Sequence, residues 1–125
     1  MRSIKVEGLD TPWTALTLGC LQLAPSKEWG DECSAEEADR VVKTALDGGI
    51  MAFDTAECYS NGESECRLGK ALGSRKNDVL IISKITPDAE MTVEAYQTRL
   101  EGTLKALGRD YVDSYLIHWP GMYLD

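Results

Sequence analysis

Four titratable residues of the sequence, Asp54, Tyr59, Lys84 and His118, are of the types needed to protonate a carbonyl oxygen. A tyrosine holds its proton at neutral pH as a general acid, and a neighbouring lysine ammonium favours the phenolate that remains after proton transfer. An aspartate would keep the lysine charged and oriented, and a histidine could donate a hydrogen bond to the carbonyl. The set therefore predicts proton transfer to a carbonyl oxygen while another species delivers a hydride.

These residues come directly after expected strands or close behind them. The strands that precede them are expected at residues 50–53, 79–82 and 111–117. In a parallel α/β protein, the carboxyl ends of the strands meet at one edge of the sheet, where reactive groups usually sit. Each residue alone also has an ordinary structural explanation, such as a turn cap for Asp54 or a solvated strand end for Lys84. Their convergence at one edge is what favours a catalytic role.

The spacing of apolar residues predicts strands that alternate with helices. Ser34 and Glu37 form the sequence pattern of a capping box, which opens a helix that ends before Gly48. The other expected elements are an N-terminal hairpin that turns near residues 8–10, a buried strand at 15–19, and helices at 65–72 and 92–107. Four strands alternating with three helices indicate an α/β fold with right-handed crossovers and a parallel sheet, in one domain over residues 1–125.

Two architectures are compatible with this order of elements. A small doubly wound sheet would be self-contained at 125 residues. A (β/α)8 barrel of the TIM type needs roughly 250 residues, so the chain would supply only about the first four β/α units. Periodicity alone leaves both architectures open.

The charge balance argues against two classes of partner. The chain has a formal net charge of -8 at pH 7, which repels both nucleic acid and anionic lipid headgroups. We therefore expect no nucleic-acid partner and no membrane partner. The N-terminus has no apolar stretch of signal-peptide length and no later segment could span a bilayer, so we expect a cytoplasmic location.

The four cysteines include no C-x-x-C pair, and we expect them to be free thiols. A zinc site that combined Cys58, Cys66 and His118 would have spacings that match no familiar ligand pattern. We therefore expect no bound metal.

Several segments, taken together, resemble the signature of the aldo-keto reductase family. They are Gly48–Tyr59, Gly62–Glu65, Leu68–Leu72, Ser83-Lys84, Leu107–Asp113 and Ile117–Pro120. The matches occur in family order and spacing over nearly all of the chain, and the combination is highly specific although no single piece is.

The resemblance implies a (β/α)8 barrel, present here as a half barrel, that reduces aldehydes or ketones with NADP(H) or runs the reverse oxidation. Under this resemblance Tyr59 is the proton donor, Lys84 promotes its ionisation, and His118 faces the substrate carbonyl. Asp54 supports the tyrosine–lysine pair and lies near the nicotinamide.

The resemblance also implies cofactor contacts at Gly19 and Cys20, which match positions close to the nicotinamide ribose. Trp29 and Trp119 match no assigned role; lining of an apolar substrate pocket and simple packing are both open for them.

The length of the sequence departs from the family pattern. Family members hold the nicotinamide amide and the adenosine 2'-phosphate after the fifth, seventh and eighth strands, beyond the four expected here. No G-x-G-x-x-G motif follows a strand, and Gly69-Lys70 lacks the glycine spacing of a phosphate loop.

Several alternatives therefore stay open. The sequence could be a truncated gene product, a fragment of a full enzyme, or a half barrel that self-associates through its open edges. A cofactor-sensing or regulatory subunit of the same fold, such as the potassium-channel beta subunits, is a further alternative.

Overall fold

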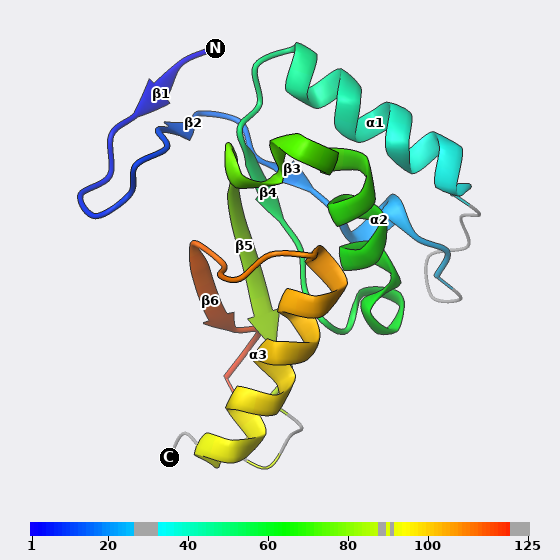
Figure 1. Cartoon of the computed structure of the whole chain (residues 1–125), viewed down its shortest axis with the longest axis vertical. Coiled ribbons are helices and arrows are strands. Elements are labelled where there is room, and N and C mark those ends of the chain that lie inside the picture. Colours follow the sequence, from blue (N-terminus) through cyan, green and yellow to red (C-terminus); the bar gives the residue numbers. More distant parts are fainter. Residues whose placement is uncertain (27–32, 88–89, 91, 121–125) are drawn as a thin grey trace.

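A parallel sheet with helices along one face organises the chain (Figure 1). The computed structural model describes residues 1–26, 33–87, 90 and 92–120. The strands of this sheet are β3 (Leu18–Gly19), β4 (Ala52–Asp54), β5 (Leu80–Ile85) and β6 (Ser114–Ile117). They lie in sequence order across the sheet, and each strand is parallel to the next. The expected parallel α/β fold is confirmed.

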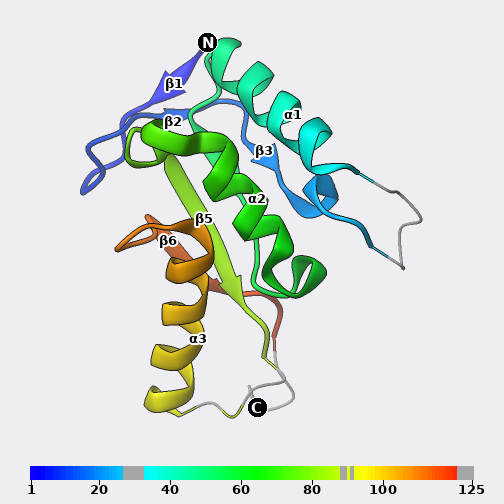
Figure 2. The same ribbon diagram turned by 45° about the vertical axis from the view of Figure 1, so that its right-hand side comes forward.

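In the described part of the chain, three helices connect the strands: α1 (Ala35–Asp47), α2 (Glu63–Leu72) and α3 (Val93–Leu107). Short 3-10 segments lie at η1 (Leu21–Leu23), η2 (Tyr59–Gly62) and η3 (Gly73–Asn77). Figures 1 and 2 show the three helices as one layer against the sheet. A sheet with consecutive strand order and helices on one face is the arrangement of a barrel segment, whereas a doubly wound sheet has helices on both faces.

The capping box predicted at the start of α1 is present. Ser34 Oγ accepts a hydrogen bond from the Glu37 amide at 3.1 Å, and the Glu37 carboxylate accepts one from the Ser34 amide at 2.9 Å. Both bonds satisfy amides that the first turn of a helix leaves without a partner. The sequence therefore fixes where α1 begins.

The hydrophobic core lies between the sheet and the helix layer. Phe53 and Ile81, on neighbouring strands, are fully buried together with Val42 of α1 and Leu68 of α2. Full burial of side chains of this size contributes roughly 1.5 to 3 kcal/mol each. The core thus holds one face of the sheet against the helices.

Gly69 allows α2 and α3 to approach closely. A Cβ at this position would lie 2.4 Å from the carbonyl oxygen of Leu107. A larger residue would push the helices apart, at a cost of about 1 to 3 kcal/mol. Gly69, which the sequence places in a helix and does not fit to a phosphate loop, therefore has a packing role.

The N-terminal part differs from its expected boundaries. The hairpin pairs β1 (Ser3–Ile4) with β2 (Trp13–Thr14), and the strand expected at 15–19 is reduced to β3. Ala15 instead donates its amide to the carbonyl of Arg2, which extends the hairpin, and residues 15–17 are exposed. The predicted start of this strand is therefore wrong, because Ala15 belongs to the hairpin and the parallel strand begins at Leu18.

Four other elements shift by a few residues, and one of them, the strand expected at 111–117, begins only at Ser114. The strand expected at 79–82 continues to Ile85, since β5 is paired on both sides, and the strand expected at 50–53 runs over 52–54. The helix expected from Glu65 begins at Glu63. Asp54 and Lys84 therefore lie within strands, where their side chains point to a defined face.

The outer strands β3 and β6 each have one hydrogen-bonded neighbour within the described ranges. Leu116 and Ile117 of β6 are 45% and 43% exposed. In the same part of the chain, no helix is both long enough and apolar enough to cross a membrane.

Candidate active site

Strand register places Gly19, Asp54 and Lys84 on the face of the sheet opposite to the helices. Gly19 pairs with Asp54, Asp54 pairs with Ile82, and Lys84 pairs with Leu116. Paired residues of parallel strands face the same side, and side chains alternate along a strand, so Ile82 and Lys84 face the same side as well. The residues of these three pairs therefore share one face. His118 follows Leu116 by two residues, just beyond the end of β6.

Lys84 and Asp54 form an ion pair across neighbouring strands. The Lys84 ammonium donates one hydrogen bond to Asp54 Oδ1 and a second, of 2.8 Å, to the carbonyl oxygen of Thr55. The Lys84 side chain is 12% exposed and that of Asp54 is 37% exposed. The pair therefore fixes a partly buried cation at the carboxyl edge of the sheet.

The loop after β4 brings Tyr59 to this cation. The centroid of the Tyr59 ring is 5.3 Å from Lys84 Nζ. Directly after Tyr59, Ser60, Asn61 and Gly62 all have positive φ angles, of 51°, 53° and 84°, and Ser60 Oγ donates to the carbonyl of Pro25. Positive φ is costly for residues other than glycine. This unusual turn separates Tyr59 from the start of α2.

His118 also packs against Tyr59. Its backbone amide donates to the carbonyl oxygen of Ile85 at 2.9 Å, which continues the pairing of β5 and β6. Its ring lies edge to face with the Tyr59 ring, with centroids 5.6 Å apart. Burial, followed by the nearby Lys84 ammonium, lowers the pKa of His118, so the ring is neutral at physiological pH.

The structure thus brings together Asp54, Tyr59, Lys84 and His118, which the sequence placed at one edge. One contiguous group holds an ion pair, a phenol and a neutral imidazole. The catalytic roles of these residues stay predictions.

Gly19 and Cys20, the predicted cofactor contacts, differ in their surroundings. A Cβ on Gly19 would find no atom within 4 Å, so the face beside Asp54 is open there. The Cys20 side chain is 0% exposed and packs in the core, and burial raises the pKa of its thiol to about 12. The Cys20 amide and carbonyl are engaged as well, with the Asp54 carbonyl and the Ser64 hydroxyl, so the residue exposes no group here and its cofactor contact stays a prediction.

Sequence reasoning gave no role to Glu57, which holds the loop that carries Tyr59. The Glu57 carboxylate accepts a hydrogen bond of 2.6 Å from the Thr86 amide and one of 2.9 Å from Arg99 Nε of α3. The sequence shows only that Glu57 is an acidic residue close to the candidates Asp54 and Tyr59. Its partner Arg99 is distant in sequence, so the pairing itself was not visible.

Cys58 is a free cysteine, as the sequence predicts. Its Sγ lies 3.4 Å from Nδ1 of His118. Within the described ranges, no three His, Cys, Asp or Glu side chains lie together as a metal site would require. Trp119 is 48% exposed with its ring centroid 4.5 Å from that of His118, and Trp29 lies outside the described residues.

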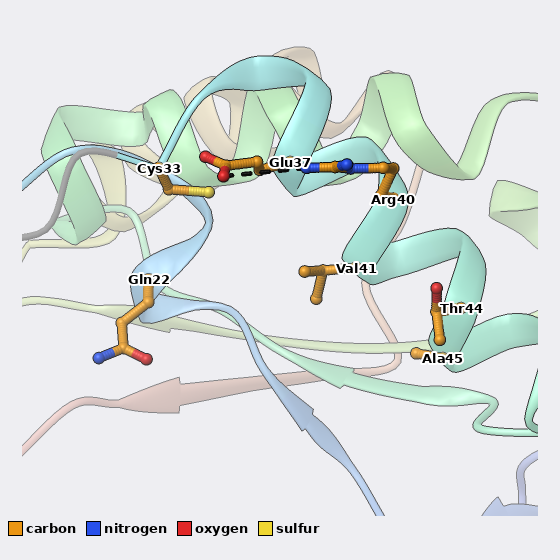
Figure 3. Close-up of a pocket in the computed structure, with 7 residues that line it drawn as sticks. All are labelled: Gln22, Cys33, Glu37, Arg40, Val41, Thr44 and Ala45. Atoms are coloured by element: carbon orange, nitrogen blue, oxygen red, sulfur yellow. Dashed lines mark ion pairs between the residues drawn. The ribbon is translucent and has the colours of Figure 1, made fainter.

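A surface pocket of about 720 Å³ lies between η1 and α1 (Figure 3). It is lined by Gln22, Cys33, Glu37, Arg40, Val41, Thr44 and Ala45. None of the four candidate residues lines this pocket. We therefore place the candidate site at the strand edge, where the titratable groups meet.

Comparison with known proteins finds relatives over most of the chain. The model of the "Aldo/keto reductase family" matches residues 15–125. An aldo-keto reductase of Mycolicibacterium smegmatis is 41% identical over 91 residues, which cover 72% of this chain and 31% of the relative. The chain spans about a third of the length of the curated relatives it matches, between 31% and 37% for the relatives compared.

Solved structures give the same result for the fold. A thermostable aldo-keto reductase, Tm1743, in complex with the inhibitor epalrestat, superposes with a TM-score of 0.80 at 34% identity. The superposition covers 100% of this chain and 45% of Tm1743. An aldo-keto reductase from Klebsiella pneumoniae in complex with NADPH has a TM-score of 0.79 at 27% identity, over 97% of this chain and 41% of that one.

Proposed function

Because the chain belongs to the aldo/keto reductase family, we propose that it supplies the proton-transfer residues of an enzyme that reduces an aldehyde or a ketone to an alcohol. The observation that carries this proposal is the cluster in which the Asp54–Lys84 ion pair lies against the ring of Tyr59. A cation beside a phenol stabilises the phenolate that remains after the proton has left. This is the charge that carbonyl protonation leaves on the enzyme.

Each residue has a specific part in the proposed step. The Tyr59 hydroxyl gives its proton to the carbonyl oxygen, and the Lys84 ammonium balances the negative charge left on the phenol. Asp54 holds Lys84 in place through their hydrogen bond. His118, which is neutral, donates a hydrogen bond to the carbonyl oxygen and orients it toward Tyr59.

The residues present fit the nicotinamide end of NADP(H). The face of the sheet beside Asp54 is open at Gly19, where even a Cβ would meet nothing within 4 Å. NADPH, when bound there, supplies the hydride. The related Klebsiella pneumoniae protein crystallised with NADPH supports this choice of cofactor.

We propose that the phosphate end of the cofactor binds outside this part of the protein. Gly69 and Lys70 lie in α2, where Gly69 is packed against α3, so they are not placed as a phosphate loop. About two thirds of the length of the relatives lies outside the matched region, since the chain covers 31% to 37% of them.

We further propose that the isolated chain associates through its outer strands. Leu116, Ile117 and Trp119, on β6 and just after it, are 45%, 43% and 48% exposed. An outer strand with unpaired backbone groups and apolar side chains favours pairing with another chain.

The proposal is tested by following NADPH absorbance in a form of the protein extended to the length of its relatives. We expect NADPH to be consumed only when an aldehyde or ketone is present, with one alcohol formed for each NADPH oxidised. Binding of NADPH without consumption, across aldehydes and ketones of varied size, would contradict reductase activity and favour the cofactor-sensing alternative.

A further inference from the structure

Cys58 lies beside the imidazole of His118, at the edge of the candidate active site. The Cys58 Sγ is 3.4 Å from His118 Nδ1. Among the residues that the structure describes, Cys58 is the one hydrogen-bond partner of the His118 ring. The two residues come from the loop after β4 and the segment after β6. The fold, not the local sequence, therefore makes this contact.

The direction of the hydrogen bond follows from the chemistry of the two groups. Burial and the Lys84 ammonium lower the pKa of His118, so one ring nitrogen carries a proton and the other is an acceptor. A thiol is a weak donor and its sulfur a weak acceptor, whereas an unprotonated imidazole nitrogen accepts well. The favourable arrangement has the thiol as donor and Nδ1 as acceptor.

The aromatic neighbours of His118 fix the orientation of its ring but not the position of its proton. The Tyr59 ring meets it edge to face at 5.6 Å, and the Trp119 ring is tilted against it by 43° at 4.5 Å. These contacts do not distinguish a protonated nitrogen from an unprotonated one. A polar partner is needed for that, and Cys58 is the polar partner present.

We propose that Cys58 is a positioning residue: its S–H donates to Nδ1 of His118 and keeps the ring proton on Nε2. One consequence rests on the proposed function: Nε2–H is then the donor that bonds to the substrate carbonyl. Without the thiol, part of the population would carry its proton on Nδ1 and present an acceptor, which repels a carbonyl oxygen.

The test is the protonation state of each ring nitrogen, read from ¹⁵N NMR. His118 is the only histidine, so a chain labelled with ¹⁵N-histidine reports on this ring alone. At about pH 8, where the ring is neutral, we expect a protonated Nε2 and an unprotonated Nδ1. Magic-angle-spinning detection keeps the measurement independent of self-association.

Three variants distinguish the proposal from a general effect on packing. Cys58→Ala removes the donor and should produce a population protonated on Nδ1, whereas Cys58→Ser keeps a donor and should retain the parent spectrum. Cys66→Ala, which removes a thiol from α2, is the matched control and should also retain it. These spectra need neither cofactor nor substrate, so their result is separate from the test of reductase activity.

A parent ring protonated on Nδ1 would overturn the proposal, since the thiol could then not be the donor. An unchanged ratio of the two tautomers in Cys58→Ala would overturn it as well.

Discussion

Lys84 donates a hydrogen bond to Asp54 on the adjacent strand, and the same ammonium lies 5.3 Å from the centre of the Tyr59 ring. Two parallel strands and the loop after one of them therefore combine a carboxylate, a cation and a phenol. The register of β4 with β5 is what makes this possible, because it sets Asp54 and Lys84 on the same face.

Lys84→Met should lower the turnover number for carbonyl reduction by about 10²-fold to 10⁴-fold, the usual contribution of general acid catalysis. The cation that stabilises the phenolate is lost, while the length of the side chain is kept. Asp54→Asn should cause a smaller loss, since the lysine stays but is less firmly held. Steady-state kinetics of both variants, each made in a protein extended to the length of the relatives, measures which substitution causes the larger loss of turnover. A larger loss in Asp54→Asn than in Lys84→Met would contradict it.

Glu57→Gln should destabilise the protein by about 2 kcal/mol, the scale of a charge-assisted hydrogen bond. The variant removes the charge that pairs with Arg99 and weakens the bond from the Thr86 amide. Because Glu57 holds the loop that carries Tyr59, turnover should fall as well. Urea unfolding measures the first effect, and Glu101→Gln on the exposed side of α3 is the matched control. Equal stability of Glu57→Gln and the control would show that the ion pair does not hold the loop.

Glu65→Gln should change the pH dependence of stability. Glu65 is 1% exposed, accepts a hydrogen bond of 2.7 Å from Ser83 Oγ, and has a pKa raised above 4.5 mainly by burial. The folded protein therefore binds this proton more tightly than the unfolded chain, so the stabilisation is complete below 4.5 and is lost as pH rises through the raised pKa.

The variant lacks this titration, so its stability relative to the parent should increase as pH rises above 4.5. Thermal melts over this range measure the difference, and Glu63→Gln, an exposed carboxyl of the same helix, controls for loss of a charge from α2. A stability of Glu65→Gln that falls relative to the parent as pH rises would contradict this prediction.

Much of this architecture is predictable from the sequence because its signals are local. The capping box at Ser34 and the apolar runs of the strands determine where α1, β4 and β5 lie, to within a few residues. The convergence of Asp54 and Lys84 follows from the rule that parallel strands end at one edge. That residues 1–125 form one domain stays a prediction.

The remaining features depend on contacts between distant segments. The pairing of Glu57 with Arg99 and the contact of Cys58 with His118 join segments that are 42 and 60 residues apart. Cys20 is buried in a cluster with Val42 and Leu68, which follow it by 22 and 48 residues. No local pattern in the sequence encodes these relationships, because each is set by packing.

The 125-residue chain alone should show no NADPH-dependent reductase activity and should not be a compact monomer. Loss of several charge-assisted bonds to the cofactor phosphates, at about 1.5 to 3 kcal/mol each, would weaken NADPH binding by orders of magnitude. Exposed residues on β6 should drive association. Size-exclusion chromatography with light scattering, alongside a fluorescence titration with NADPH, measures both properties. A monomer that binds NADPH at micromolar concentration and reduces an aldehyde would mean that this part of the barrel is sufficient.

Tyr59→Phe tests the central claim most directly, because it removes one hydroxyl and keeps the ring that packs against Lys84 and His118. The measurement is the turnover of an aldehyde by parent and variant, with the NADPH dissociation constant determined on the same samples, in a form extended to the length of the relatives. We predict that turnover falls by about 10²-fold to 10⁴-fold while NADPH affinity is nearly unchanged. Equal turnover in variant and parent would remove Tyr59 as the proton donor and contradict the account.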